Sequence, residues 1–189
     1  WIYRHILADK RSGGDLYKHL RCQKKRRKRY GCPERRGKLP NRVSIEERPL
    51  IVDQRERLGD WEIDTVIGKN QHGALVSIVE RKSRYTVLRL VERRQADLVK
   101  QATISGLQPL ADRVHTITSD NGKEFAAHVD IAEALQADFY FAHPYASWER
   151  GLNENTNGLI RQYFPKGSDF SSLTETLSVS VSDKLNHRP

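Results

Sequence analysis

Three acidic side chains, Asp64, Asp120 and Glu154, have the residue types of a metal-binding catalytic site. Carboxylate oxygens suit hard divalent cations such as Mg²⁺ or Mn²⁺, and the sequence has no Cys or His cluster that would favour a softer metal. Two such ions about 4 Å apart activate the attacking oxygen and stabilise the leaving oxygen of an in-line phosphoryl displacement. Bound metal also removes the repulsion among three unpaired carboxylates. The triad therefore predicts two bound Mg²⁺ or Mn²⁺ ions and phosphodiester chemistry on DNA.

Each of these carboxylates also has an ordinary structural interpretation. Asp60 and Glu62 alternate with Asp64 in the same run, so any one of the three is equally a solvated strand residue. Asp120 begins an Asp-Asn-Gly triplet, which is a typical turn sequence. Glu154 opens a predicted helix, where a carboxylate interacts favourably with the helix dipole. Taken singly, the residues leave both interpretations open.

Hydrophobic periodicity indicates the elements that position these side chains. The run GDWEIDTVIG, which contains Asp64, alternates as a strand does. Two further β-rich runs, GALVSIVER and RYTVLRLVE, are joined by the short polar turn RKSR. The natural interpretation is three sequential antiparallel strands.

From Gln95 onward, helices and strands alternate. Residues 95–110, EFAAHVDIAEALQ, NENTNGLIRQYF and SSLTETLSVSVSDKLN are predicted helices, whereas VHTITSD and DFYFAHP are short strands. The order β-β-β-α-β-α-β-α-α predicts an α/β fold, a mixed five-stranded sheet made of the antiparallel meander and two parallel strands, flanked by helices. If the first and fourth strands are neighbours, Asp64 and Asp120 meet at one edge, within reach of Glu154.

Positive charge is concentrated in the N-terminal segment. The formal net charge is +9, yet residues 1–57 hold 18 Lys/Arg against 7 Asp/Glu, while residues 58–189 hold 15 against 17. We therefore expect a basic DNA-contacting arm and connector over 1–57 and a catalytic core over 58–189. Repelling charges interrupted by Gly and Pro favour an extended arm that neutralises DNA phosphates, although a solvated linker is the alternative. The densest cations are Lys24, Lys25, Arg26, Arg27, Lys28 and Arg29.

The remaining composition excludes several classes of protein. No apolar run reaches bilayer-spanning length and the N-terminus does not resemble a signal peptide, so we expect a cytoplasmic protein without a membrane partner. Cys22 and Cys32 have no second pair at zinc-site spacing, which argues against a structural zinc or disulfide. Because the chain starts at Trp1 and stops at KLNHRP, we expect a fragment of a longer protein.

The segment from GDWEIDTVIGK to HPYASWERGLNENTNGLIRQYFPKG resembles the catalytic core of bacterial insertion-sequence transposases of the IS-thirty type. That group has a ribonuclease-H-like fold, shared with retroviral integrases, and is named for its Asp-Asp-Glu triad. The resemblance places the triad at Asp64 in WEIDTV, Asp120 in TSDNGKEF and Glu154 in RGLNENTNG, with thirty-three residues between the last two. This spacing also excludes Glu149.

The resemblance implies a DNA transposase that cleaves insertion-element ends and transfers their 3′-hydroxyls into target DNA. Double-stranded DNA would be its partner, and the active complex would be a homo-oligomer associated with the bacterial nucleoid. Two other functions stay open, a plain nuclease of the ribonuclease H or junction-resolvase kind and a non-catalytic DNA-binding remnant. Nothing before the arm looks like the helix-turn-helix domain that recognises element ends in such transposases, so end recognition cannot be assigned to these residues.

Several residues near the triad are candidate DNA contacts. Related transposases carry a basic residue seven positions after the Glu, which is Arg161 here, and it would contact a phosphate unless it is an ordinary surface arginine. Trp61 and Trp148 are expected to pack, with base stacking as the alternative for Trp148. The other candidates are Lys123, Asn153, Asn155 and Asn157.

Overall fold

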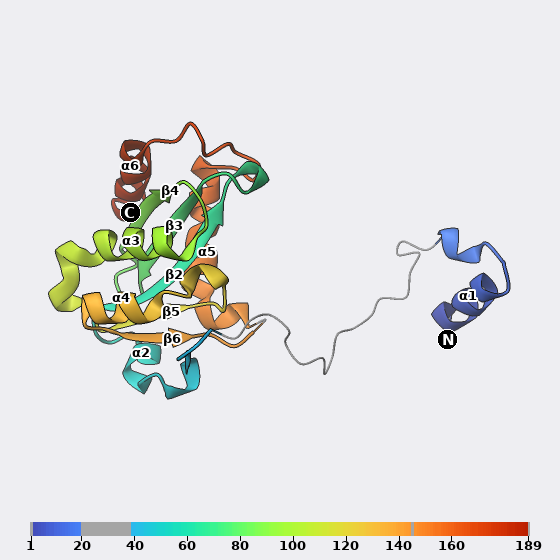
Figure 1. The fold of residues 1–189 in the computed structure, drawn as a ribbon, viewed down its shortest axis with the longest axis horizontal. Coiled ribbons are helices and arrows are strands. Elements are labelled where there is room, and N and C mark those ends of the chain that lie inside the picture. The colour runs from blue at the N-terminus through green and yellow to red at the C-terminus, as the bar shows by residue number, and fades with distance from the viewer. Residues whose placement is uncertain (1, 20–38, 145, 189) are drawn as a thin grey trace. The chain divides into compact units, whose positions relative to one another are not determined.

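The computed structural model describes residues 2–19, 39–144 and 146–188, which fall into two compact units, residues 1–38 and 39–189 (Figure 1). The first unit contains helix α1 (Ile2–Arg11) and a 3₁₀ helix (Leu16–His19). The carboxylate of Asp9 accepts a hydrogen bond from the Leu16 backbone at 3.2 Å and so links the two helices. The predicted arm cations, Lys24 to Arg29, lie outside the described residues.

Within the described part of the second unit, a mixed sheet of six strands has the order β1-β6-β5-β2-β3-β4. Strands β2, β3 and β4 pair antiparallel, whereas β2 with β5, β5 with β6, and β6 with β1 pair in parallel. The predicted meander and the adjacency of the first and fourth predicted strands, β2 and β5, are thus confirmed. The strands are β1 (Val43–Ser44), β2 (Asp60–Ile67), β3 (Ala74–Glu80), β4 (Thr86–Val91), β5 (Thr116–Ser119) and β6 (Asp138–Phe141).

The predicted strand number of five is wrong because the segment 39–57 contributes β1. Its two residues, Val43 and Ser44, pair with Tyr140 and Phe141, and such a short strand has no periodicity to detect. After Ser44 the chain forms a 3₁₀ helix (Ile45–Glu47) with a capping box. Residues 39–57 are part of the second unit, so residue 57 marks a change in charge within that unit.

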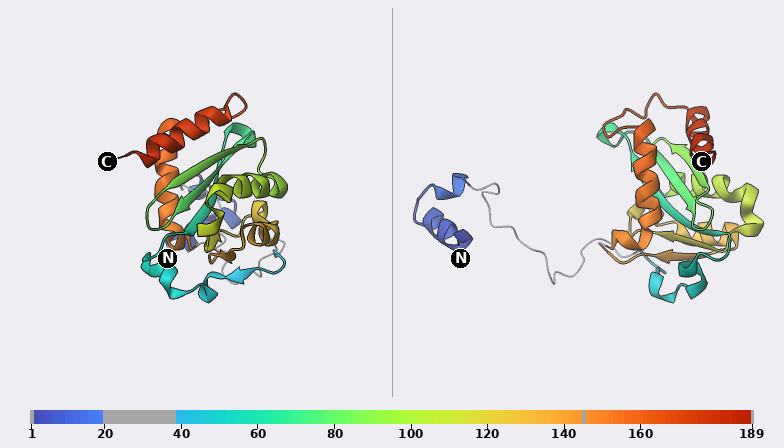
Figure 2. Two further views of the ribbon diagram at one scale, coloured as in Figure 1. Left: turned by 90° about the vertical axis from the view of Figure 1, so that its left-hand side faces the viewer. Right: turned by 180° about the vertical axis from the view of Figure 1, so that it is seen from behind.

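Helices cover both faces of the sheet (Figure 2). The core on one face joins α3 and α4 to Ile63 and Val76, and the core on the other joins α5 and α6 to Val66 and Leu75. Because side chains alternate along a strand, Glu62 and Asp64 lie on the face of Val66, which is the α5 face. The helices are α2 (Leu50–Gln54), α3 (Ala96–Leu107), α4 (His128–Leu135), α5 (Gly151–Tyr163) and α6 (Glu175–Asn186). Among the described residues, no helix is long and apolar enough to cross a membrane.

Candidate functional site

Strand register brings Asp64 and Asp120 together. In the parallel pairing of β2 with β5, Glu62 is opposite Thr118, and each aspartate follows two residues later on its own chain segment. The carboxylates consequently meet where β5 ends. Burial raises the pKa of Asp64, Arg150 opposes that rise, and the negative charge of Asp120 adds to it.

Arg150 lies between these two aspartates. Its Nη1 is 3.5 Å from Asp64 Oδ2 and its Nη2 is 3.6 Å from Asp120 Oδ2, while only 12% of the Arg150 side chain is exposed. Nη1 also donates to the Ile63 carbonyl oxygen at 3.4 Å. This arginine was not among the predicted site residues, although its position four residues before Glu154 was a usable signal; in the structure it ends a 3₁₀ helix (Ser147–Arg150). A positive charge is therefore accommodated between the two carboxylates, which is the property a metal site requires.

Glu154 occupies the first turn of α5 and is exposed to solvent. Within the described ranges, no group of three or more His, Cys, Asp or Glu side chains lies close enough to hold a metal ion. The structure thus brings together two members of the predicted triad, and the third stands on the adjacent helix. Asn157, three residues after Glu154 and on the same side of α5, contacts Asp64.

The Asn157 amide orients Asp64. Its Nδ2 donates to Asp64 Oδ2 at 3.0 Å, and its Oδ1 accepts from Ser77 Oγ at 2.9 Å. A second hydrogen bond to Asp64 comes from the Thr65 backbone N–H, 2.8 Å from Oδ1. Asn157 was predicted as a DNA contact, and in the structure both ends of its amide are engaged with the site itself.

Asp120 forms a turn with one of its carboxylate oxygens and directs the other toward Arg150. Its Oδ1 accepts a hydrogen bond from the Gly122 backbone at 2.8 Å, as a turn-forming aspartate does. Its Oδ2 is the atom nearest to Arg150, and 41% of the side chain is exposed. The turn hence fixes the carboxylate without using up its second oxygen.

Asp60 and Glu62 are not solvated strand residues, because both are fully buried. Asp60 pairs with Arg57 at 2.9 Å and accepts a hydrogen bond from Thr116. Glu62 Oε1 pairs with Arg81 Nη1 at 2.6 Å, and its Oε2 accepts from the Asn153 backbone N–H at 3.0 Å. Glu62 therefore anchors the start of α5 through Asn153, which immediately precedes Glu154.

The loop before α5 is held by an exposed charged pair. Glu149, the excluded triad candidate, accepts hydrogen bonds from the backbone and the Nδ1 of His143, both at 2.8 Å. These bonds and the nearby Glu46 raise the pKa of His143, with the Glu149 hydrogen bond as the main cause. Glu149 thus links the start of the segment 143–150, which carries Arg150, to its end.

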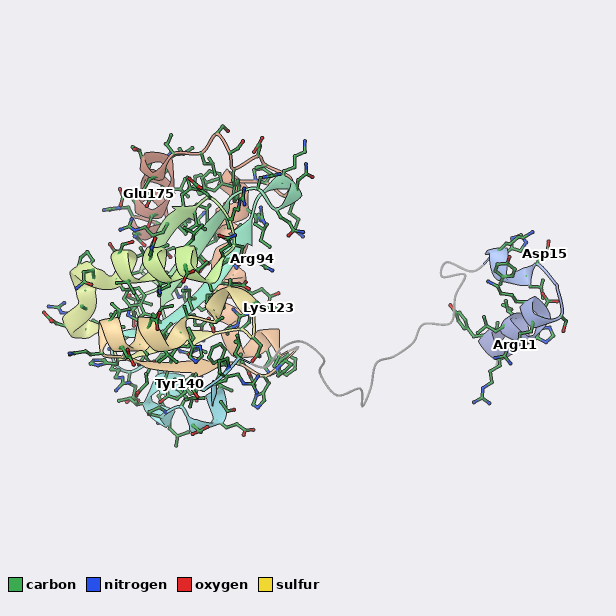
Figure 3. The ribbon with its side chains drawn as sticks, in the orientation of Figure 1. Arg11, Asp15, Arg94, Lys123, Tyr140 and Glu175 are labelled. Carbon is green, nitrogen blue, oxygen red and sulfur yellow. The ribbon has the colours of Figure 1, made fainter. Side chains whose placement is uncertain are left out.

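A groove of about 510 Å³ lies beside the site. Arg93, Arg94 and Lys123 line it, and Figure 3 labels the last two. The buried Glu124 pairs with Arg94 at 3.3 Å and accepts a hydrogen bond from Thr65 Oγ1 at 3.1 Å, which links the groove to the residue after Asp64. Lys123 was a predicted DNA contact, whereas Arg93 and Arg94 were not, although the RRQ that follows the third meander strand was a usable signal.

The other predicted DNA contacts have distinct environments. Arg161 is half-buried and donates to the carbonyl oxygens of Ile67 at 3.0 Å and Phe164 at 3.4 Å, so it is not an ordinary surface arginine, and burial lowers its pKa. Asn153 is fully buried. Trp61 packs in the core as expected, but the packing expected for Trp148 is wrong because 76% of its side chain is exposed.

Comparison with known proteins gives a match to a family model and several transposase relatives. Residues 54–147 match the family model described as integrase core domain. The chain is 50% identical over 189 residues to the transposase for insertion sequence element IS4351 of Bacteroides fragilis, covering 100% of this chain and 58% of that protein. Over 153 residues it is 39% identical to the transposase InsI for insertion sequence element IS30C of Escherichia coli (strain K12), covering 80% of this chain and 39% of that protein.

A solved structure shares the fold. A simian T-cell lymphotropic virus intasome, determined in complex with the PP2A regulatory subunit B56 gamma, contains a chain that is 19% identical with a TM-score of 0.52, covering 99% of this chain and 73% of that one. The predicted α/β, ribonuclease-H-like fold class is confirmed, with six strands in place of five. The chain spans 58% or less of the length of each of these two transposases. The chain is therefore similar to bacterial insertion-sequence transposases, and its residues 54–147 match an integrase core domain.

Proposed function

We propose that the chain is the catalytic part of a DDE-type transposase, which cleaves the ends of an insertion element and joins their 3′-hydroxyls to target DNA. The pairing of Asp64 with Asp120 around a positive charge is the observation that carries this proposal. It unites a carboxylate of β2 with one that directly follows β5, beside the helix that bears Glu154. The coarser function, DNA transposition, agrees with the sequence relatives.

Asp64, Asp120 and Glu154 would hold two Mg²⁺ or Mn²⁺ ions. When bound, such ions supply activation of the attacking oxygen and stabilisation of the leaving oxygen. The chain's own contribution is positional: Asn157 and the Thr65 backbone hold Asp64, and the Gly122 backbone holds Asp120. A single buried carboxylate, Glu62, anchors the start of the helix from which Glu154 extends.

Cations around this site would bind the phosphates of double-stranded DNA. Lys123, Arg93 and Arg94 line the groove beside Asp64, where they can contact a phosphate backbone without reading its sequence. Trp148 is exposed in the 3₁₀ helix (Ser147–Arg150) before α5 and is available to stack on an unpaired base. The remaining proposed contacts are Arg161, Asn157, Lys24, Lys25, Arg26, Arg27, Lys28 and Arg29.

We further propose that the active complex is a homo-oligomer, because joining two element ends in one reaction requires two aligned catalytic sites. The protein would act at DNA in the bacterial nucleoid.

Strand cleavage and joining test the reaction. Incubating the protein with Mg²⁺ and duplexes that end in the element's terminal repeats should give joined products, which Asp120→Asn and Glu154→Gln should abolish while DNA binding persists. Asp112→Asn removes an exposed carboxylate from a 3₁₀ helix (Gln108–Arg113) and should leave joining intact. Nicked but unjoined products would favour a nuclease, and full joining by either triad variant would refute the proposal.

A further inference from the structure

Arg150 bridges two aspartates that are both partly exposed to solvent. Only 12% of its side chain is exposed, and its two terminal nitrogens approach separate aspartates at 3.5 and 3.6 Å. Both separations exceed the range of a charge-assisted hydrogen bond, which is about 2.7–2.9 Å. By contrast, Arg81 lies 2.6 Å from Glu62. Arg150 thus interacts with the two aspartates mainly through charge rather than through directed hydrogen bonds.

The surroundings of Arg150 make this contact replaceable. Its Nε atom is buried and has no hydrogen-bond partner within the described part of the chain, so the side chain is not locked in place by a full set of bonds. Asp120 is 41% exposed, and an ion pair that reaches solvent contributes little stability. Moving Arg150 away from Asp120 would consequently cost little.

A divalent ion cannot share this position with the guanidinium. Magnesium binds carboxylate oxygens at about 2.0–2.1 Å, and the Arg150 nitrogens lie against the same Oδ2 atoms. Two positive groups that close together repel each other strongly in a partly buried site. Either the arginine or the metal therefore holds these oxygens.

We propose that Arg150 is a built-in counter-ion that keeps Asp64 and Asp120 together before metal binds, and that divalent ions must displace it to form the active site. This inference rests on the proposed function, because it takes the two aspartates as metal ligands. Arg150 lowers the repulsion between the aspartates in the metal-free protein, and in doing so it weakens their apparent affinity for metal. The arginine sets the metal concentration at which the site becomes active.

Calorimetric titration of the whole chain with MnCl₂, without DNA, tests this inference directly. Arg150→Gln should bind Mn²⁺ on the order of tenfold more tightly than the wild type, since two partly exposed ion pairs no longer compete. Arg150→Lys restores the positive charge and should return the affinity toward the wild-type value. The matched control is Arg89→Gln, which removes an arginine paired with Glu175 at 3.3 Å, away from the site, and should bind as the wild type does.

The outcomes separate this inference from the proposed function. If Asp120→Asn binds Mn²⁺ more weakly than the wild type does, the metal site is present. In that case, Mn²⁺ binding by Arg150→Gln that is equal to or weaker than that of the wild type overturns the counter-ion role. If Asp120→Asn binds Mn²⁺ as well as the wild type does, the metal site itself is refuted and both proposals fall.

A second measurement covers the case in which Arg150→Gln does not fold. A crystal structure of the wild-type chain soaked in MnCl₂ should show the Arg150 guanidinium more than 4 Å from both Oδ2 atoms. Arg150 remaining between the aspartates beside a bound ion would overturn the inference.

Discussion

Two charged clusters lie two residues apart on the same face of β2, and they are built differently. Glu62 and Arg81 are 0% and 5% exposed, and their nearest atoms are 2.6 Å apart. Asp64 and Arg150 are 23% and 12% exposed, and their nearest atoms are 3.5 Å apart. The first pair is short, closed and fully bonded, whereas the second is long and open to solvent through Asp120. One strand thus carries both a permanent anchor and a displaceable contact.

The contrast shows how a fixed framework can support a site that must change. Glu62 ties the start of α5 to β2 through the Asn153 backbone, and Arg81 reaches further to the Val52 carbonyl oxygen at 3.1 Å. Desolvation by burial lowers the pKa of Arg81, and its ion pair with Glu62 opposes that shift. The anchor keeps α5 in register while the charges around Asp64 and Asp120 exchange partners.

Breaking the anchor should have the largest effect. Glu62→Gln keeps an acceptor for the Asn153 backbone but leaves the buried Arg81 with only its long ion pair to Asp53, at 3.6 Å, so the free energy of unfolding should fall by about 3–5 kcal/mol. Urea denaturation followed by circular dichroism measures the loss. The double variant Glu62→Gln with Arg81→Met removes the stranded charge and should recover part of the stability. A loss below about 1 kcal/mol would show that the Glu62–Arg81 ion pair contributes as little to stability as an exposed ion pair does.

Filling the open cluster with metal should have the next largest effect. A ligand that binds only the folded state stabilises it by about 2.7 kcal/mol when its concentration is one hundred times the Kd. Thermal unfolding of the second unit should therefore shift upward with MnCl₂, and Asp120→Asn should remove the shift. An equal shift in Asp120→Asn would place the bound ion elsewhere on the protein.

Removing the Asn157 amide should have a smaller effect on stability. Asn157→Ala deletes the 3.0 Å hydrogen bond to Asp64 and leaves the Ser77 hydroxyl with only its longer hydrogen bond to the Asp64 carbonyl oxygen at 3.4 Å, which should lower the free energy of unfolding by about 1–3 kcal/mol. The variant should also bind Mn²⁺ more weakly because Asp64 is less well oriented. Asn155→Ala, on the exposed side of the same helix, serves as the control. Equal stability and Mn²⁺ affinity in both variants would mean that Asn157 does not orient Asp64.

The sequence predicted the framework better than the charge arrangement. The strand carrying Asp64 and the turn at Asp120 follow from local patterns, since alternation and an Asp-Asn-Gly triplet are encoded within a few residues. Burial of Asp60 and Glu62 was missed because it depends on partners distant in the chain, as Arg81 shows. The same holds for Arg150, whose contacts with β2 and the end of β5 exist only once the sheet has formed. The β1 strand escaped notice for a different reason, its length of two residues.

The smallest expected effect concerns the exposed pair in the loop that carries Arg150. Glu149 and Glu46 raise the folded-state pKa of His143 above its unfolded value of 6.5. Protonated His143 therefore stabilises the folded chain fully below pH 6.5, and this contribution is lost as the pH rises through the raised folded-state pKa.

Tm measured across that window should fall slightly more in the wild type than in His143→Gln or Glu149→Gln. Because the pair is exposed, 0.5 M NaCl should weaken the difference, whereas the buried Glu62 pair should respond far less to salt. If the Tm of the wild type and of both variants depends on pH in the same way, the charged pair does not stabilise this loop. The position of Arg150 would then depend on the backbone contacts of the loop alone.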